Sequence, residues 1–170
     1  IAKLRELAKW SLKFTSQVTI SSTDSLLLEI GGSLKIFKTT PKIIQKIKND
    51  LKKIGYTATM SIGPTPLSAQ YFAECRLEVI IQTQRELLRA LGELPASTLE
   101  DNPKSSLLLS KLGISSIQQL RSLPRKEVIH RFGNKLLANS DKALGRTPDP
   151  QKKFIPKKKF ITSIDTPYSI

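Results

Sequence analysis

Asp24 is the residue whose type and position in this chain could best support metal chemistry. It stands at the entry of a short apolar run, residues 26–30, where a strand end would present its carboxylate. Two-metal catalysis needs several carboxylates around hard cations such as Mg²⁺, and the neighbouring Ser25 offers only a hydroxyl. Glu29 lies five residues on and would face the opposite side of a regular strand, so it cannot complete a site with Asp24. A turn residue is therefore the favoured interpretation of Asp24, with metal binding as the alternative.

A β-hairpin is the element that must position Asp24. Residues 17–22 alternate and contain β-branched side chains, and the apolar run 26–30 ends at a Gly-Gly pair. Short runs bounded by turn residues are typical of strands rather than helices. The sequence thus predicts two strands joined by a turn at residues 21–25.

Helices and two further strands are predicted around this hairpin. Spacings of three and four predict an amphipathic helix over residues 3–14. A second helix is expected to begin with Thr40 as cap and Pro41 in its first turn and to end at Gly55. Its apolar stripe is Ile44, Ile47, Leu51 and Ile54, and the lysines opposite are interpreted as a solvated face. Strands are predicted over residues 56–62 and 78–82, with a short helix over 67–74 between them.

The second half is predicted to be entirely helical. A capping-box sequence at residues 83–86 begins one helix, and four more are expected over residues 106–112, 116–123, 125–132 and 134–144. A glycine between two helices lets backbone N–H groups approach a phosphate closely, and the next helix adds its positive end. The Leu-Gly-Ile-Ser turn around Gly113 could do this, or it could simply connect two helices.

The chain is strongly basic. Lys and Arg outnumber Asp and Glu by 28 to 14, giving a net charge of +14. Such an excess indicates a polyanionic partner, of which nucleic acid is the leading choice and a membrane surface the alternative. Residues 151–160 hold five lysines among nearby prolines and are interpreted as an extended basic linker.

The single cysteine and single histidine exclude two common kinds of site. One cysteine, Cys75, cannot form an internal disulfide, and one Cys with one His falls short of the usual zinc ligand count. His130 has no partners that the sequence can place in a catalytic triad, so a structural role is expected for it.

Ordered blocks of the sequence resemble the Y-family (translesion) DNA polymerases. The hairpin with Asp24 resembles the palm strand that carries their catalytic Asp-Glu pair, with Ser25 at the position of the Glu. The segments LLLEIGGSLKIF and PTP (residues 64–66) are closer to the ImuB-like branch, which has lost catalytic carboxylates. LGISSIQQLRSLP (residues 112–124) resembles the helix-hairpin-helix of the thumb.

The resemblance implies an α+β fold and a fragment of a longer protein. A mixed palm sheet with packed helices would occupy residues 1–93, and a small all-helical thumb residues 94–147. A basic linker toward a missing little-finger domain would occupy residues 148–170. The residues expected to contact DNA are Lys111, Gly113, Ser115, Ser116, Lys135, Lys152, Lys153, Lys157, Lys158 and Lys159.

The implied function is DNA binding in damage tolerance and induced (SOS) mutagenesis, without catalysis. The resemblance implies primer-template DNA, a replicative-type polymerase, a recombinase-related protein and the sliding clamp as partners. It also implies a bacterial, cytoplasmic, nucleoid-associated location. No cofactor is expected, and no catalytic residue beyond Asp24 as a remnant; Mg²⁺ would bind only if the site is active. Three alternatives stay open: an active error-prone polymerase, a general helix-hairpin-helix nucleic-acid module, and an RNA-binding basic protein, against which the few aromatic residues argue.

Overall fold

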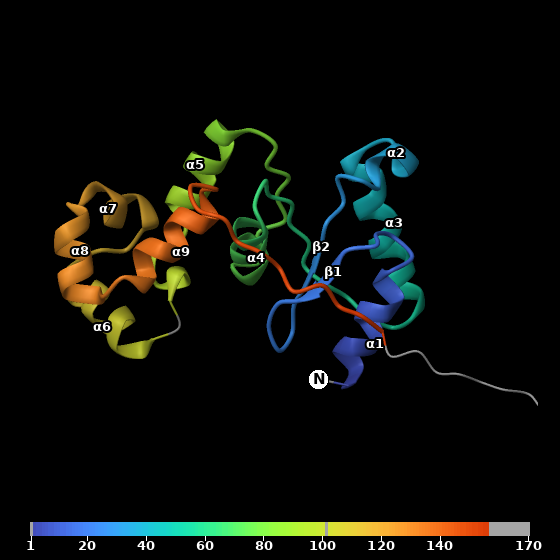
Figure 1. Ribbon diagram of the computed structural model, residues 1–170, viewed down its shortest axis with the longest axis horizontal. Helices are drawn as coiled ribbons and strands as arrows, with labels where there is room; N and C mark the ends of the chain where they lie inside the picture. Colours follow the sequence, from blue (N-terminus) through green and yellow to red (C-terminus); the bar gives the residue numbers. More distant parts are fainter. Residues whose placement is uncertain (1, 101, 157–170) are drawn as a thin grey trace, which may run out of the picture.

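The computed structural model describes residues 2–100 and 102–156, and these form a mostly helical chain with one small sheet (Figure 1). The elements of the first part are α1 (Ala2–Ser11), β1 (Val18–Ile20), β2 (Leu26–Leu28), α2 (Leu34–Phe37), α3 (Thr40–Lys53) and α4 (Pro66–Glu74). They are followed by α5 (Gln84–Glu93), a short 3₁₀ helix (Ala96–Leu99), α6 (Pro103–Lys111), α7 (Ile117–Ser122), α8 (Arg125–Phe132) and α9 (Lys135–Ala143). No described helix is long and apolar enough to cross a membrane.

The predicted β-hairpin is confirmed. β1 and β2 pair antiparallel with Val18 opposite Leu28, and the Ser21 N–H donates to the Ser25 carbonyl across the turn at 3.1 Å. α1 and α3 pack beside this hairpin through a small core (Figure 1). The core residues are Phe14, Ile43, Ile47 and Leu51, with Trp10, Leu28 and Ile30 partly buried against them.

The predicted start and stripe of α3 need correction. Thr39, not Thr40, is the cap residue, and Thr40 is buried inside the first turn. Ile43 rather than Ile44 is fully buried, and Ile54 is 43% exposed because it lies just past the last helical residue. Gly55 follows with φ +79°, the left-handed conformation that ends a helix, as predicted.

The predicted mixed palm sheet is larger than the sheet that forms. Instead of strands over residues 56–62 and 78–82, the described chain has one parallel bridge between Ile62 and Ile80. The two segments contribute to different hydrophobic cores. Tyr56 and Met60 pack on the core between α1 and α3, whereas Ile81 belongs to the larger core described below. Residues 57–59 are exposed, and the described residues supply no neighbouring strand to extend the ladder.

A second, larger core joins α4 and α5 to the helices after residue 94. It includes Phe72, Leu87, Leu91, Leu99, Ile117, Leu120, Val128 and Leu136, all buried. α5 packs against α7, and α4 against α9. The two cores thus divide the chain near residues 61–65, whereas the predicted domain limits at 93 and 147 stay a prediction.

Thr65 fixes the contact between α4 and α9. Its hydroxyl accepts a hydrogen bond from the Ser68 N–H at 3.1 Å, which caps α4, and lies 2.8 Å from the Ala143 carbonyl, to which it donates. Ser68 is completely buried at this joint. The PTP segment of the sequence therefore forms a structural joint with the end of α9.

Asp141 ties α8, α9 and the start of the tail together. The Arg125 guanidinium donates to both carboxylate oxygens, at 3.2 and 2.7 Å, and Arg146 lies 3.5 Å away. These guanidinium groups, Arg125 above all, lower the pKa of Asp141, which is largely shielded from solvent. A carboxyl with a lowered folded-state pKa contributes stability above its unfolded pKa, and this stability is lost as pH falls through the folded value.

The tail returns from α9 across the molecule to the edge of the hairpin (Figure 1). The Phe154 N–H donates to the Val18 carbonyl of β1 at 2.7 Å. The Arg5 guanidinium of α1 lies 5.7 Å from the centre of the Phe154 ring. The tail between residues 146 and 154 therefore links the two cores.

We predict that Thr65→Ala destabilises the protein more than Thr83→Ala does. Thr83 also caps a helix, α5, through a capping box, but within residues 2–100 and 102–156 it makes no bond to another helix that parallels the Thr65–Ala143 contact. Loss of a cap costs about 1 kcal/mol, and a buried carbonyl left without its donor about 1–3 kcal/mol more. Urea unfolding of both variants measures the difference, and Thr65→Ser should recover most of the loss. Equal losses in both alanine variants would mean that the Ala143 contact adds nothing.

Candidate nucleic-acid interface

The first candidate element is the turn between α6 and α7. α6 ends at Lys111, Gly113 adopts φ +70°, and Ser116 caps α7. A Cβ at Gly113 would meet nothing within 4 Å, so the backbone angle rather than lack of space requires glycine. The structure places Lys111, Gly113, Ser115 and Ser116 together in this turn, with Lys111 and Ser115 exposed.

Three hydrogen-bond donors converge on one side-chain oxygen in this turn. Gln119 Oε1 accepts from the Ser115 N–H at 2.8 Å, the Ser115 hydroxyl at 2.9 Å and the Ser116 N–H at 3.2 Å. The remaining N–H groups of the turn are satisfied inside the protein: Gly113 donates to Ser110, Ile114 to Leu109 and Ile117 to Leu94. A phosphate oxygen that entered this turn would therefore take the place of the Gln119 oxygen.

A second helix–glycine–helix turn lies between α8 and α9. Gly133 adopts φ +79°, and Asn134 precedes α9 without a side-chain cap. Lys135 is exposed at the first position of α9, with its ammonium 3.9 Å from the Glu100 carboxylate. The Glu100 side chain is 9% exposed, and its other carboxylate oxygen, Oε2, has no hydrogen-bond partner among the described residues. Part of the Lys135 charge is thus balanced within the protein.

The tail lysines lie at a different part of the molecule. Lys152 and Lys153 are exposed just before Phe154, which pairs with β1, while both turns belong to the lobe formed by α6–α9 (Figure 1). The fold does not gather the predicted DNA-contacting residues in one place. Some lie in the turns between the helices α6–α9, and others lie beside the hairpin. Lys157, Lys158 and Lys159 lie outside the described residues.

Asp24 is exposed in the turn between β1 and β2. Its Oδ1 accepts a hydrogen bond from the Ser22 hydroxyl at 2.9 Å, and that hydroxyl also contacts the Ser25 hydroxyl. The Ser21 hydroxyl donates to the Gln70 side chain, which attaches the turn to α4. Within residues 2–100 and 102–156, no three His, Cys, Asp or Glu side chains are grouped so as to hold a metal ion. The contacts of Asp24 are those of a turn residue.

Sequence reasoning did not include Gln119, Gly133 or Asn134 among the candidate residues. Ser116 and Gln119 have the Ser-x-x-Gln spacing of a capping box, and Phe132-Gly133 repeats the apolar-Gly pattern of Leu112-Gly113. Both signals are present in the sequence. His130 lines a shallow hollow with Leu108, Leu112, Glu127 and Arg131, which include no Ser or Cys for a triad with it.

Residues 2–74 match the impB/mucB/samB family, which covers the hairpin, α3 and α4. The resemblance to Y-family polymerases is confirmed. The chain is 27% identical over 144 residues to the protein ImuB of Caulobacter vibrioides, covering 85% of this chain and 31% of that protein. It is 26% identical over 124 residues to DNA polymerase IV of Moorella thermoacetica, covering 71% of this chain and 31% of that protein. The chain thus spans about a third of the length of these relatives.

Solved structures share the fold. DinB from Sulfolobus solfataricus superposes with a TM-score of 0.74 at 21% identity, covering 89% of this chain and 46% of that one. An insertion ternary complex of Dbh DNA polymerase gives a TM-score of 0.69 at 18% identity, covering 89% and 47%. The described residues therefore have the fold of about half of such a polymerase.

We predict that Gln119→Glu weakens binding to duplex DNA while leaving the fold intact. A glutamate accepts the same hydrogen bonds from Ser115 and Ser116, and Glu is a normal capping-box residue. Its negative charge would oppose a phosphate at the same place, so the dissociation constant should rise by about fivefold to tenfold. Fluorescence anisotropy measures binding, and a thermal melt checks folding.

Gln118→Glu provides the matched control, because Gln118 is exposed one position away and accepts no hydrogen bond from the described residues of this turn. If both variants lose DNA binding equally, the turn only connects α6 and α7 and does not contact the phosphate.

Proposed function

We propose that the chain binds primer-template DNA in damage tolerance and induced mutagenesis and does not itself insert nucleotides. The observation that carries DNA binding is the convergence of three donors on the Gln119 oxygen at a glycine turn, in a chain with a net charge of +14. Backbone and hydroxyl donors of this kind hold a phosphate without reading the base sequence. The protein would therefore position DNA rather than select a sequence.

The absence of catalysis is proposed from the turn around Asp24. Asp24 is the only acidic residue of that turn, and Ser25 stands where the resemblance places a catalytic carboxylate. A neutral hydroxyl is a poor ligand for Mg²⁺ in comparison with a carboxylate. The Ser22 hydroxyl bridges Asp24 and Ser25, which gives both side chains a role in the turn itself. Mg²⁺ would enter only if residues outside this chain supply further carboxylates.

The wider role and the domain limits of this chain are proposed from its similarity to ImuB. We propose a partial palm in residues 1–93, a thumb in 94–147 and a linker from 148 on. The partners would be a replicative-type polymerase, a recombinase-related protein and the sliding clamp, in the bacterial cytoplasm near the nucleoid. A helix-hairpin-helix module without polymerase ancestry is disfavoured, because the family match lies over residues 2–74, before both glycine turns.

Primer extension on the intact protein tests the catalytic half of this proposal. We expect binding to a primer-template without extension in Mg²⁺ or Mn²⁺, and unchanged binding in Asp24→Ala. Glu29→Ala serves as the control, because Glu29 is an exposed carboxylate that accepts from the Gly31 N–H instead. Extension that disappears in Asp24→Ala but persists in Glu29→Ala would establish an active polymerase.

The tail lysines should act through charge alone. Replacing Lys152 and Lys153 by Gln should weaken binding equally for unrelated DNA sequences. It should also reduce the slope of log K against log salt by about 1 for each phosphate that is no longer neutralised. Lys38→Gln together with Lys104→Gln removes the same charge from exposed sites elsewhere and should change the slope little. An unchanged slope in the tail variant would remove residues 152 and 153 from the interface.

A further inference from the structure

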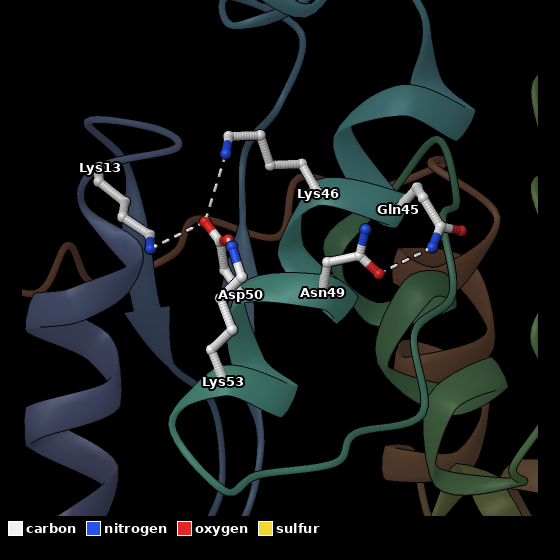
Figure 2. Close-up of polar contacts among 6 residues, drawn as sticks. All are labelled: Lys13, Gln45, Lys46, Asn49, Asp50 and Lys53. Atoms are coloured by element: carbon white, nitrogen blue, oxygen red, sulfur yellow. Dashed lines mark hydrogen bonds and ion pairs between the residues drawn. The ribbon is translucent and has the colours of Figure 1, made fainter.

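Three exposed lysines from two segments of the chain surround one carboxylate on the surface of the part that contains α1 and α3. The Asp50 carboxylate lies 3.1 Å from the Lys13 ammonium, 3.5 Å from that of Lys46 and 3.4 Å from that of Lys53 (Figure 2). The Asp50 side chain is 14% exposed, while the three lysine side chains are 44%, 56% and 76% exposed. Hydrogen bonding from Lys13 is the main cause that lowers the pKa of Asp50. The cluster therefore carries a surplus of positive charge on its exposed side.

Two aromatic rings restrain the ammonium group of Lys13. It lies 4.2 Å from the centre of the Trp10 ring and 4.8 Å from that of Phe14, both parts of the α1–α3 core. Cation–π contacts of this kind restrict a long side chain that would otherwise move freely. Lys13 thus contributes a preorganised charge rather than a freely solvated one.

Lysines also form a straight ridge along α3. Lys42, Lys46, Asn49 and Lys53 follow one another at i, i+4, i+7 and i+11, which puts them on one side of the helix over about 16 Å. The buried residues Ile43, Ile47 and Leu51 occupy the opposite side. Lys42 and Lys52 are exposed and form no ion pair within the described part of the chain. Asn49 is also held by a hydrogen bond within α3, because the Gln45 side-chain amide donates to the Asn49 side-chain oxygen at 2.9 Å (Figure 2).

The crowding of like charges does not by itself stabilise α3. Like charges at i, i+4 on a helix are mildly destabilising, and Lys48 on another side of α3 has its own partner, Glu78, at 2.8 Å. Asp50 offsets only one of the three charges around it. The surplus is therefore available to an anionic partner.

We propose that the ridge of Lys42, Lys46, Asn49 and Lys53, with Lys13 beside it, is a docking surface for an acidic helix of a partner protein. A helix that presents carboxylates at i, i+4, i+7 and i+11 has the same spacing and would lie along α3. Its acidic side chains complement the exposed lysines, and Asn49 and Gln45 supply polar contacts. Such ion pairs at a surface determine orientation and the rate of association as well as affinity.

The position of the ridge favours a protein over nucleic acid. The core side of α3 faces the hairpin, so the ridge points away from the hairpin, and α3 lies at the opposite end of the molecule from α6–α8 (Figure 1). The glycine turns of the candidate DNA interface belong to that other end.

The test uses a labelled helical peptide with glutamates at i, i+4, i+7 and i+11 and a matched peptide with glutamines there. Fluorescence anisotropy at low salt should show binding of the glutamate peptide only. The variant with Lys42, Lys46 and Lys53 changed to Glu should bind it about tenfold more weakly or worse, because three surface ion pairs become three repulsive pairs. Asp50→Asn should bind it more tightly, by about twofold to fivefold, because the competing carboxylate is gone.

A control variant distinguishes an effect of this surface from an effect of the net charge of the protein. Arg89, Lys104 and Lys126 are exposed on other helices, and changing these three to Glu alters the net charge by the same amount. Similar losses in both triple variants, or no binding of the peptide, would overturn the proposal. Loss of duplex DNA binding in the α3 variant together with competition by DNA would assign the ridge to nucleic acid instead. Circular dichroism confirms that both variants fold, and binding of DNA by the α3 variant tests the proposed function separately.

Discussion

The contact of α4 with α9 is the constraint on which the arrangement of this molecule depends. α4 touches β2 of the first lobe and α5 and α9 of the second, and Thr65 caps it while bonding to the end of α9. Because that hydroxyl sits beside the completely buried Ser68, the geometry tolerates little adjustment. This joint helps to fix the position of both glycine turns relative to the hairpin. The tail supplies a second link, from α9 back to β1.

Carboxylates organise the basic side chains of this protein in a way that total charge does not reveal. Asp50 gathers three lysines, Asp141 binds Arg125 and lies near Arg146, and Glu100 lies beside Lys135. Each of these carboxylates is mostly shielded, while the cations around it remain much more exposed. The acidic residues thus fix the cations in position, and the cations present their charge to the surface. The proposed DNA interface and the proposed docking surface on α3 thus use different groups of cations.

In the DNA interface that we propose, Gln119 satisfies the donors of the α6–α7 turn while no phosphate is bound. A helix start leaves several N–H groups without partners, and a neutral amide oxygen can accept them until an anionic oxygen arrives. The exchange would replace three neutral hydrogen bonds by charge-assisted ones, which are stronger. Asn134 has no such side-chain cap at the corresponding position of the second turn, so the two turns differ in what a phosphate must displace.

The sequence by itself determined the local elements: the hairpin, the helix ends at Gly55 and Gly113, and the capping boxes of Thr83 and Ser116. These depend on backbone conformation and on hydrogen bonds within a few residues, which residue type and spacing encode directly. The family resemblance could also be read from ordered blocks of residues. Only the tertiary structure decided which segments share a core. It left residues 56–62 and 78–82 with a single bridge instead of strands, because their apolar side chains pack on different cores. It also brought Lys13 to Asp50, and Phe154 to Val18, across separations that no local pattern encodes.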